Sequence, residues 1–347
     1  MVAAGAGVLT AVQVASPAAA CACGAPTPVA DDPNGDVMVD HELAIISRQG
    51  QKEQVDMRLG VESLARDSGL IMPTPGPAVV SQGDASAFDA LAAQMAPQVV
   101  TTREWWRPSF FSGGPGPSSA AAPDPGAPVV LAQVQLGPLQ ATTLEASDAD
   151  GLTKWLDAHG YGLRDEVASL LTKYVERNWY FVAIKLTSDS ALSGELDPIR
   201  FVFDTPQSGL VYPLILSQAA RSAQTVNLYV FDDHRRAVGF DGGRYVEEMG
   251  ADEDLTWAGP VDQESLLPYG RYLTTYMLYF DDPAQQIAGD LVFPQASDDT
   301  GYTPVVYQTE YMEFLGIPLG WWGVAVVIVA AVIVAIRPRR GHGEGVG

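Results

Sequence analysis

Two cysteines separated by one residue, Cys21 and Cys23, carry the most reactive side chains of this 347-residue chain. A Cys-x-Cys pair can close a small, strained and reducible disulfide, and thiols outside the cytoplasm tend to oxidise. Two thiolates alone do not complete a tetrahedral metal site, and the chain has no further cysteine. The pair therefore fits a structural disulfide, free or lipidated thiols, or redox or metal chemistry.

A second candidate for chemistry is the run Asp232, Asp233 and His234, which two arginines follow. Carboxylates and an imidazole can together hold a cation, but side chains at neighbouring positions rarely point to one spot. The same residues are typical of a charged hairpin turn. A cation site and a solvated turn are both open at this point.

The sequence signatures of familiar catalytic sites are absent. The chain contains no His-Glu-x-x-His, no Gly-x-Ser-x-Gly and no phosphate-binding P-loop. Acidic pairs such as Asp298 with Asp299 do not follow the spacing of a calcium-binding EF-hand. No cofactor is predicted, and a non-enzymatic role is favoured over an enzymatic one.

The charge balance restricts the partners. The chain has 42 Asp and Glu against 20 Lys and Arg, a net charge of −22. Nucleic acid is excluded as a partner because binding its backbone needs clustered basic residues. An apolar content of 47% rules out a mainly disordered chain, and the length allows two domains or one large one. An acidic outer domain would stay soluble, would be repelled by an anionic bilayer, and could collect divalent cations weakly.

Both ends of the chain predict export and anchoring. Residues 2–14 are small, apolar and uncharged, and Ala18, Ala19 and Ala20 fit the rule for signal-peptide cleavage, although a basic n-region is missing. Residues 317–336 contain no charge and would span about 30 Å as a helix, which predicts one transmembrane helix. Aromatic residues near its start and basic residues after its end predict an extracellular N-terminal domain and a cytoplasmic C-terminus in the cell membrane. These anchor residues are Trp321, Trp322, Arg337, Arg339 and Arg340.

The part between the two ends predicts an α+β fold, with mostly antiparallel sheets and a few amphipathic helices. Strands are expected at 41–48, 53–61, 69–73, 129–136, 140–145, 180–186, 199–204, 210–214, 225–231, 237–240, 271–280 and 290–293. Helices are expected from Asp84 to about Met95, at 148–158 after an N-cap at Ser147, and at 165–177, with His159 ending the second. Tyr269, Tyr272, Tyr276 and Tyr279 would form either a sugar- or peptide-binding surface or part of the core.

A Pro/Gly-rich stretch divides this part of the chain. The predicted organisation is a signal peptide at 1–20, a first α+β subdomain at 21–106, a linker or loop at 107–128, a second α+β subdomain at 129–296, a juxtamembrane stretch at 297–316, the transmembrane helix at 317–336 and a cytoplasmic stub at 337–347.

Several fragments occur in a familiar order. They include Cys21-Ala22-Cys23-Gly24, Leu70-Ile71-Met72-Pro73, Gly151-Leu152-x-x-Trp155-Leu156, His159-Gly160-Tyr161 and Val211-Tyr212-Pro213-Leu214. In these the chain resembles the bacterial domain-of-unknown-function family 2330, over roughly residues 21–300. The resemblance implies an exported, often membrane-anchored protein and carries over no catalytic residues.

Three hypotheses for function follow. The first is a single-pass cell-surface module that meets the bilayer through its C-terminal helix and binds an envelope protein, a glycan or divalent cations. The second is an extracytoplasmic enzyme or redox or metal protein that uses Cys21 and Cys23, or Asp232, Asp233 and His234. The third is a purely structural envelope spacer.

Overall fold

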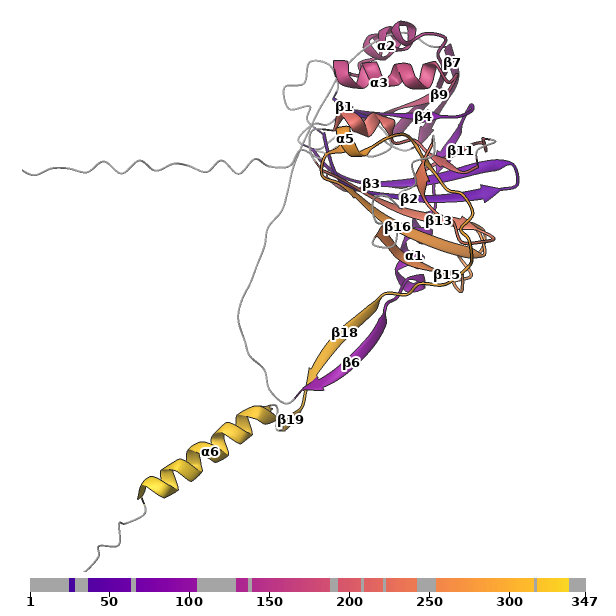
Figure 1. Cartoon of the computed structure of the whole chain (residues 1–347). Coiled ribbons are helices and arrows are strands. Elements are labelled where there is room, and N and C mark those ends of the chain that lie inside the picture. The colour runs from indigo at the N-terminus through magenta and orange to yellow at the C-terminus, as the bar shows by residue number, and fades with distance from the viewer. Residues whose placement is uncertain are drawn as a thin grey trace, which may run out of the picture. The chain divides into compact units, whose positions relative to one another are not determined.

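The fold is known from a computed structural model (Figure 1). It describes residues 25–28, 37–63, 67–104, 129–136, 139–187, 193–206, 209–220, 223–241, 254–314 and 317–336. The described chain forms two compact units. Unit 1 takes Met1–Ala96 and Gly116–Thr303, and unit 2 takes Pro97–Pro115 and Pro304–Gly347.

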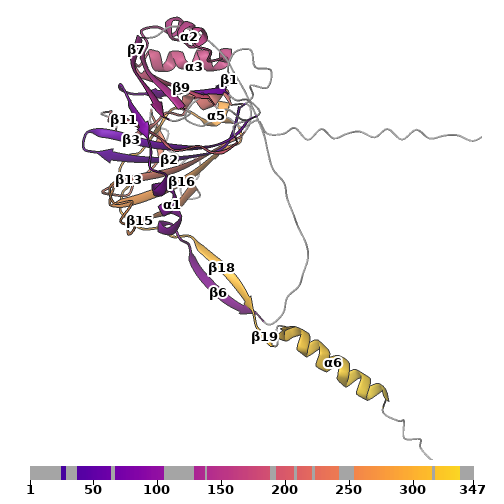
Figure 2. The ribbon, with the colours of Figure 1, turned by 180° about the vertical axis from the view of Figure 1, so that it is seen from behind.

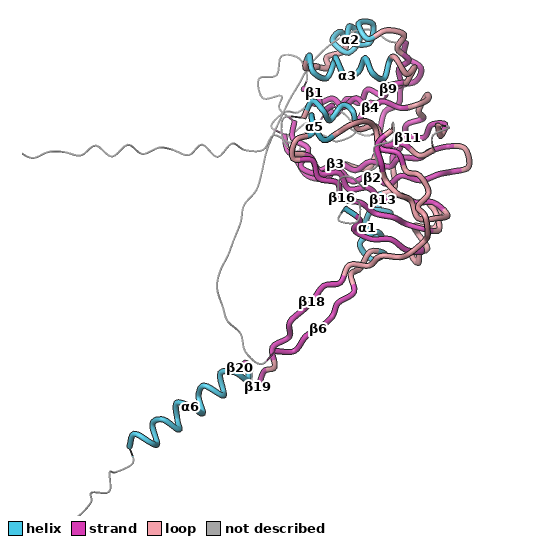
Figure 3. Tube along the Cα trace, in the orientation of Figure 1, coloured by secondary structure: helices cyan, strands magenta, loops and turns pink. Residues whose placement is uncertain are grey.

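Unit 1 is built mainly from strands, with a few short helices (Figure 3). A five-stranded antiparallel sheet has the order β1 (Ala25–Pro28), β4 (Asp67–Thr74), β9 (Tyr180–Thr187), β8 (Leu139–Glu145), β7 (Val129–Leu136). A larger sheet has the order β15 (Leu255–Pro260), β16 (Tyr272–Phe280), β13 (Gln224–Asp232), β2 (Val37–Gln49), β3 (Lys52–Ser63), β11 (Ile199–Asp204), β5 (Val79–Gln82), with β10 (Ser193–Glu195) also paired to β3. A small sheet joins β12 (Val211–Tyr212), β17 (Leu291–Val292) and β14 (Gly239–Phe240).

The two large sheets pack face to face, and helices cover their outer faces. On β2, Ala44 and Ile46 join the core between the sheets, whereas Ile45 packs on the other side beneath α1 (Ala85–Gln94). This follows from the two-residue period of a strand, which sends successive side chains to opposite faces. Because both faces of β2 are buried, the strand is apolar at consecutive positions.

The five-stranded sheet is covered on its outer face by two helices. Phe181 and Ala183 of β9 pack against α2 (Ala149–Ala158), α3 (Asp165–Val175) and the 3-10 helix η1 (Ile215–Ala219). Seen from behind, α2 and α3 again lie over the five-stranded sheet, and α1 lies beyond the larger sheet (Figure 2). Unit 1 therefore has four layers, in the order helix, sheet, sheet, helix.

Local signals explain where the helices begin and end. Asp84 caps α1, where its carboxylate accepts the Ser86 amide at 2.9 Å, and the helix ends at Met95 as predicted. For α2 the cap is Asp148 rather than the predicted Ser147, since the Asp148 carboxylate reaches the Gly151 amide. His159 ends α2 as predicted, where its ring stacks on Trp155 at 3.8 Å.

The two predicted subdomains, 21–106 and 129–296, share the sheets of unit 1, apart from residues 97–104, which belong to unit 2. Strand β4 of the first lies between β1 and β9 of the five-stranded sheet. The hairpin β2–β3 lies between β13 and β11 of the larger sheet, and β2 pairs with β13 in parallel. Residues on both sides of the Pro/Gly-rich stretch thus complete the same two sheets, a long-range pairing that local patterns do not reveal. The α+β class and the mostly antiparallel pairing are confirmed.

Unit 2 contains a parallel two-stranded ribbon and a helix. The ribbon pairs β6 (Gln98–Glu104) with β18 (Val305–Tyr311), so the predicted juxtamembrane stretch 297–316 includes a strand. β19 (Glu313–Phe314) pairs with β20 (Ile317–Pro318), and α6 (Leu319–Ile336) follows. The predicted helix at 317–336 therefore starts two residues later, after Pro318.

Within the residues that the structure describes, no helix has the length and apolar character that crossing a membrane requires.

Candidate functional site

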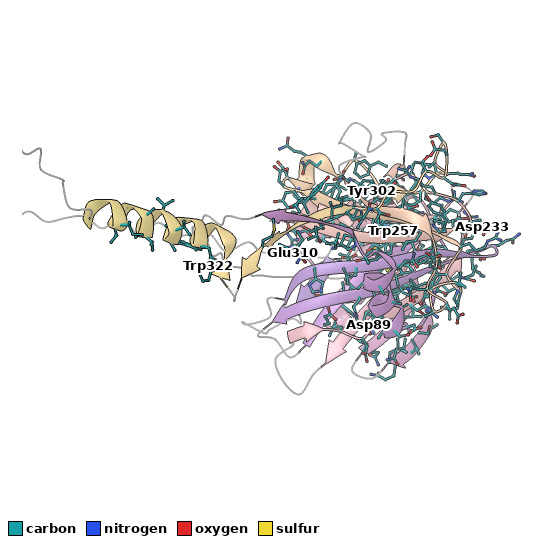
Figure 4. All side chains as sticks on the ribbon, turned by 90° about the horizontal axis from the view of Figure 1, so that it is seen from below. Asp89, Asp233, Trp257, Tyr302, Glu310 and Trp322 are labelled. Carbon is teal, nitrogen blue, oxygen red and sulfur yellow. The ribbon has the colours of Figure 1, made fainter. Side chains whose placement is uncertain are left out.

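The run Asp232–His234 lies at the end of β13, where the larger sheet meets solvent. Asp232 accepts from Arg236 at 2.6 Å and lies 3.8 Å from the Arg48 guanidinium. Asp233 pairs with Arg271 at 2.9 Å, and this partner lowers the pKa of the Asp233 carboxyl. Figure 4 shows Asp233 projecting outward from the sheets.

His234 turns to a third partner. Its Nδ1 lies 2.8 Å from the Asp299 carboxylate, whose other oxygen accepts the Arg235 amide at 2.8 Å. These contacts, the His234 hydrogen bond first, lower the pKa of Asp299. The Tyr272 hydroxyl donates to the Asp299 carbonyl at 3.0 Å. These hydrogen bonds hold the segment around Asp299 against the end of β13.

The three residues of the predicted cation site do not converge, because each side chain has its own partner. In the described part of the chain, no group of three His, Cys, Asp or Glu residues could hold a metal ion. The geometry is that of a charged turn, the alternative which the sequence had left open.

Four carboxylates of unit 1 are buried: Glu42, whose Oε1 accepts from the Tyr212 hydroxyl, and three with no exposed surface, Asp56, Asp290 and Glu53. Asp56, on β3, accepts from Arg200 through two bonds, Nε to Oδ1 at 2.7 Å and Nη2 to Oδ2 at 2.5 Å. The Tyr269 hydroxyl donates to the same carboxylate at 2.9 Å. Burial, followed by the neighbouring Asp56 charge, raises the pKa of Tyr269. This bidentate pair links β3 to β11 beneath α1.

Asp290 lies just before β17 and collects four donors. Its Oδ1 accepts from the Tyr174 hydroxyl at 2.5 Å and from the Leu214 amide at 2.8 Å, and Oδ2 accepts from Arg177 at 2.7 Å. The Ile215 amide is 3.2 Å from Oδ1. Burial outweighs these bonds and raises the pKa of Asp290. Asp290 therefore joins α3, η1 and the small sheet at one point.

Glu53 is the least satisfied of the three. Its Oε1 accepts the Val211 amide at 2.9 Å, whereas its buried Oε2 has no hydrogen-bond partner among the described residues. Burial raises the pKa of the Glu53 carboxyl well above its ordinary value, more than the Val211 amide and Arg48 lower it. A protonated Glu53 meets less desolvation cost at this position.

The arrangement of these groups favours a structural role. Two of the three fully buried carboxylates are held by an arginine that is itself partly exposed, and all three tie separate elements together. Groups so engaged link separate elements of the fold. A general acid or base must instead be able to exchange its proton with a substrate.

Sequence reasoning did not single out these residues. Asp56 falls on the polar side of an alternating strand, and Asp290 opens an apolar run, so each has the pattern of an ordinary surface residue. The only available signal was that each lies inside a predicted strand, where Asp is depleted.

The other predicted residues fall into three groups. Cys21, Cys23, Arg337, Arg339 and Arg340 lie outside the described residues. Trp321 and Trp322 stand at the start of α6, 53% and 37% exposed, and Figure 4 shows Trp322 at that end of the helix. Of the four tyrosines, Tyr269, Tyr272 and Tyr276 are buried and only Tyr279 is exposed.

Most of this chain matches one known protein family. A family model described as an uncharacterised protein conserved in bacteria, DUF2330, matches residues 17–294. The chain is a member of the DUF2330 family. The match ends within unit 1, just after β17, so the family model covers the four-layered fold of this DUF2330 protein and stops before β18.

No curated protein sequence matches this DUF2330 chain. Among solved structures it is similar to baculovirus P35, at 10% identity and a TM-score of 0.31, over 77% of this chain and 97% of that one. A mutated baculovirus P35 after caspase cleavage gives 9% identity and a TM-score of 0.32, over 77% and 100%. TM-scores this low do not establish a common fold.

Proposed function

We propose that this protein is a single-pass cell-surface module. Residues 317–336 would anchor it in the cell membrane, and unit 1 would lie outside as a binding or structural domain. Its partner would be an envelope protein, a glycan or divalent cations.

The exposure of α6 is the observation that carries the proposal. Val326, Val327, Ile328 and Val329 are each at least 57% exposed. Successive helical residues are about 100° apart, so these four apolar side chains point in nearly every direction around the axis. A helix that is apolar all round needs a surrounding of protein or lipid.

The flanking residues favour lipid and an orientation. The 18 residues of α6 would extend about 27 Å, slightly less than a typical hydrocarbon core, and bilayers thin locally to accept a short span. Trp321 and Trp322 suit one interface and the three arginines the cytoplasmic one. The part before residue 337 has 41 acidic and 17 basic residues, a balance that suits a domain held off an anionic surface.

The ion pairs of unit 1 support a module over an enzyme. Each of the three residues that the sequence marked for chemistry has its own acidic or basic partner: Asp232 contacts Arg236, Asp233 contacts Arg271 and His234 contacts Asp299. A surface of paired charges fits recognition of polar partners, with specificity set by charge arrangement.

Alkaline carbonate washing of membranes that contain the full chain tests the anchor. The wild-type chain should stay in the membrane pellet. The double change Val329→Asp with Ala330→Asp should release it, because each charge at a helix centre costs about 2.5–3.5 kcal/mol of insertion. The matched pair Val329→Leu with Ala330→Leu should stay in the pellet.

Protease treatment of intact spheroplasts tests the orientation. Added protease should digest unit 1 while a cytoplasmic control protein survives. A wild-type chain that washes off with carbonate, or a unit 1 that is protected while an exposed control is digested, would refute the proposal.

A further inference from the structure

A hydrogen-bond acceptor and a hydrogen-bond donor without partners lie on neighbouring strands of unit 1. The acceptor is Oε2 of the fully buried Glu53 on β3, and the donor is the buried Nε of Arg48 on β2. Neither atom has a hydrogen-bond partner among the described residues. In the register of the β2–β3 hairpin, Arg48 lies directly opposite Glu53. Side chains at such positions share one face of the sheet, with Cβ atoms about 4.5–5.5 Å apart, so the long Arg48 side chain can reach the Glu53 carboxyl.

Arg48 instead turns toward Asp232 at the end of β13. Its Nε lies 3.8 Å from Oδ2 of Asp232, which is longer than a hydrogen bond. The same Oδ2 accepts from Nη2 of Arg236 at 2.6 Å, and Oδ1 accepts the Asp233 amide at 2.7 Å. Both oxygens of Asp232 therefore have a donor without Arg48, and Asp232 loses no hydrogen bond when Arg48 leaves.

The surroundings of Glu53 leave room for the Arg48 guanidinium. Oε1 of Glu53 accepts the Val211 amide at 2.9 Å, which fixes the carboxyl. Two residues earlier, Gly209 has a φ of 101°, a backbone conformation that favours glycine. Nη2 of Arg48 lies 4.0 Å from the place where a Cβ of Gly209 would stand. The guanidinium and the Glu53 carboxyl thus both lie beside the segment 209–211.

The elements packed against β3 bring few groups that could answer a charge on Glu53. The strand β11 places the uncharged Phe203 opposite Glu53. The charged and titratable side chains on the other elements are Arg48 and Glu42 of β2, Tyr212 of β12, Asp232 of β13 and Arg236 after that strand. Glu42 accepts from the Tyr212 hydroxyl, and Asp232 accepts from Arg236. Arg48 is the remaining cation, and its charge already lowers the pKa of Glu53 against the larger, opposite effect of burial.

We propose that Arg48 changes its partner from Asp232 to Glu53 when Glu53 loses its proton. At low pH the buried Glu53 carboxyl is neutral, and Arg48 stays beside Asp232. As pH rises, Glu53 releases its proton to solvent, and Arg48, which carries its charge at every pH in this range, donates Nε–H to the ionised Oε2. A buried carboxylate that lacks such a pair is costly, and this cost drives the exchange.

The exchange makes the contact between two sheets depend on pH. An ionised Glu53 is a stronger acceptor for the Val211 amide than a neutral one. Val211 belongs to β12 of the small sheet, and Glu53 belongs to the larger sheet. Arg48 and Glu53 therefore form a pH-sensitive clasp, which holds the small sheet more firmly as pH rises.

The Nε–H signal of Arg48 in a ¹⁵N NMR spectrum tests the exchange directly. The full chain in mild detergent would carry ¹⁵N-labelled arginine, and the signal would be assigned by its loss in Arg48→Lys. From pH 5 to pH 8 the signal should shift, and its exchange with water should slow at least about tenfold relative to that of Arg271. Arg271 is the matched control because its Nε donates to the exposed Asp233, whose pKa is lowered, so that this pair does not change in the range.

Glu53→Gln separates the exchange from a general effect of pH. The glutamine keeps an acceptor for the Val211 amide and places an NH₂ group in the position of Oε2, so it offers Arg48 no new acceptor. The Arg48 signal should then be constant relative to that of Arg271, and unchanged thermal melting at pH 5 would show that the variant is folded. A wild-type Arg48 signal that does not respond to pH, or one that responds equally in Glu53→Gln, would overturn the proposal.

Urea unfolding of double variants gives a second measurement. At pH 8, Arg48→Met should raise the unfolding equilibrium constant at least about tenfold more in the wild-type chain than in Glu53→Gln. At pH 5 the two effects should agree within about twofold. The same cycle with Asp232→Asn in place of Glu53→Gln should show a coupling that weakens from pH 5 to pH 8. A coupling between Arg48 and Glu53 that is equal at both pH values would refute the exchange.

Discussion

Units 1 and 2 bury their apolar residues in opposite ways. In unit 1, strands such as β2 and β9 are covered on both faces, by a second sheet and by helices. In unit 2, the valines of β6 and β18, Tyr307 and most of the described apolar side chains of α6 are exposed. Unit 1 buries its apolar side chains within its own core, whereas the apolar side chains of unit 2 need a cover from outside that unit.

This contrast separates folding from attachment. A domain with its own core can fold alone, and a two-stranded ribbon or an apolar helix cannot be stable in water without a cover. The family match, residues 17–294, covers most of unit 1 and also strand β6 of unit 2. The functional contacts of the chain are expected where the burial is incomplete.

The largest expected effect compares a buried side chain of unit 1 with an exposed side chain of unit 2. Phe201 is fully buried between the two large sheets. Phe201→Ala should lower the free energy of unfolding of unit 1 by about 3–5 kcal/mol. Val306→Ala in the ribbon should change the same free energy by less than about 0.5 kcal/mol. Urea unfolding of the full chain in detergent, followed by near-UV circular dichroism, measures both.

Comparable losses from the two changes would break the comparison, since the ribbon would then belong to the cooperative unit that unfolds with the sheets.

The strand pattern of unit 1 was largely predictable from sequence, and its assembly was not. Alternation in 53–61 and the apolar run 180–186 identify β3 and β9, because period and β-branched content are local properties. The insertion of β2–β3 between β13 and β11 depends on contacts about 180 residues apart along the chain, as between Ile45 and Tyr229. No local pattern encodes such a partner.

The next effect in size concerns Asp290. Asp290→Ala leaves the Leu214 and Ile215 amides and the Tyr174 hydroxyl without their buried acceptor, and should cost about 3 kcal/mol of unfolding free energy. Asp241→Ala removes a partly exposed partner of the same Arg177 and serves as the matched change, with a loss near 1 kcal/mol. The same urea titration measures both.

Equal small losses from the two changes would mean that the hydrogen bonds of Asp290 do not stabilise the contact between α3, η1 and the small sheet. The stability of unit 1 would then depend little on this buried carboxylate.

The charged sites show why sequence reasoning stops at the residue type. The sequence marks Asp232, Asp233 and His234 as a group because they are adjacent, and adjacency on a turn sends their side chains to three different partners. Conversely, the carboxylates that do join distant elements, Asp56 and Asp290, are isolated in sequence. Their function depends on donors supplied from more than 70 residues away.

The smallest expected effect concerns Glu53, whose buried Oε2 has no hydrogen-bond partner among the described residues. Burial raises its folded pKa above the ordinary value of 4.5, so the folded state favours the protonated carboxyl. The contribution of Glu53 to stability is therefore full below about pH 4.5 and is lost as pH rises from there through the folded pKa. Glu53→Gln does not titrate at this position, so the free energy of unfolding of this variant minus that of wild type should increase from pH 5 to pH 8. Glu264→Gln, at an exposed position, is the control variant in parallel urea titrations. A difference that stays flat, or falls with pH, would show that the folded state does not favour the protonated Glu53 carboxyl.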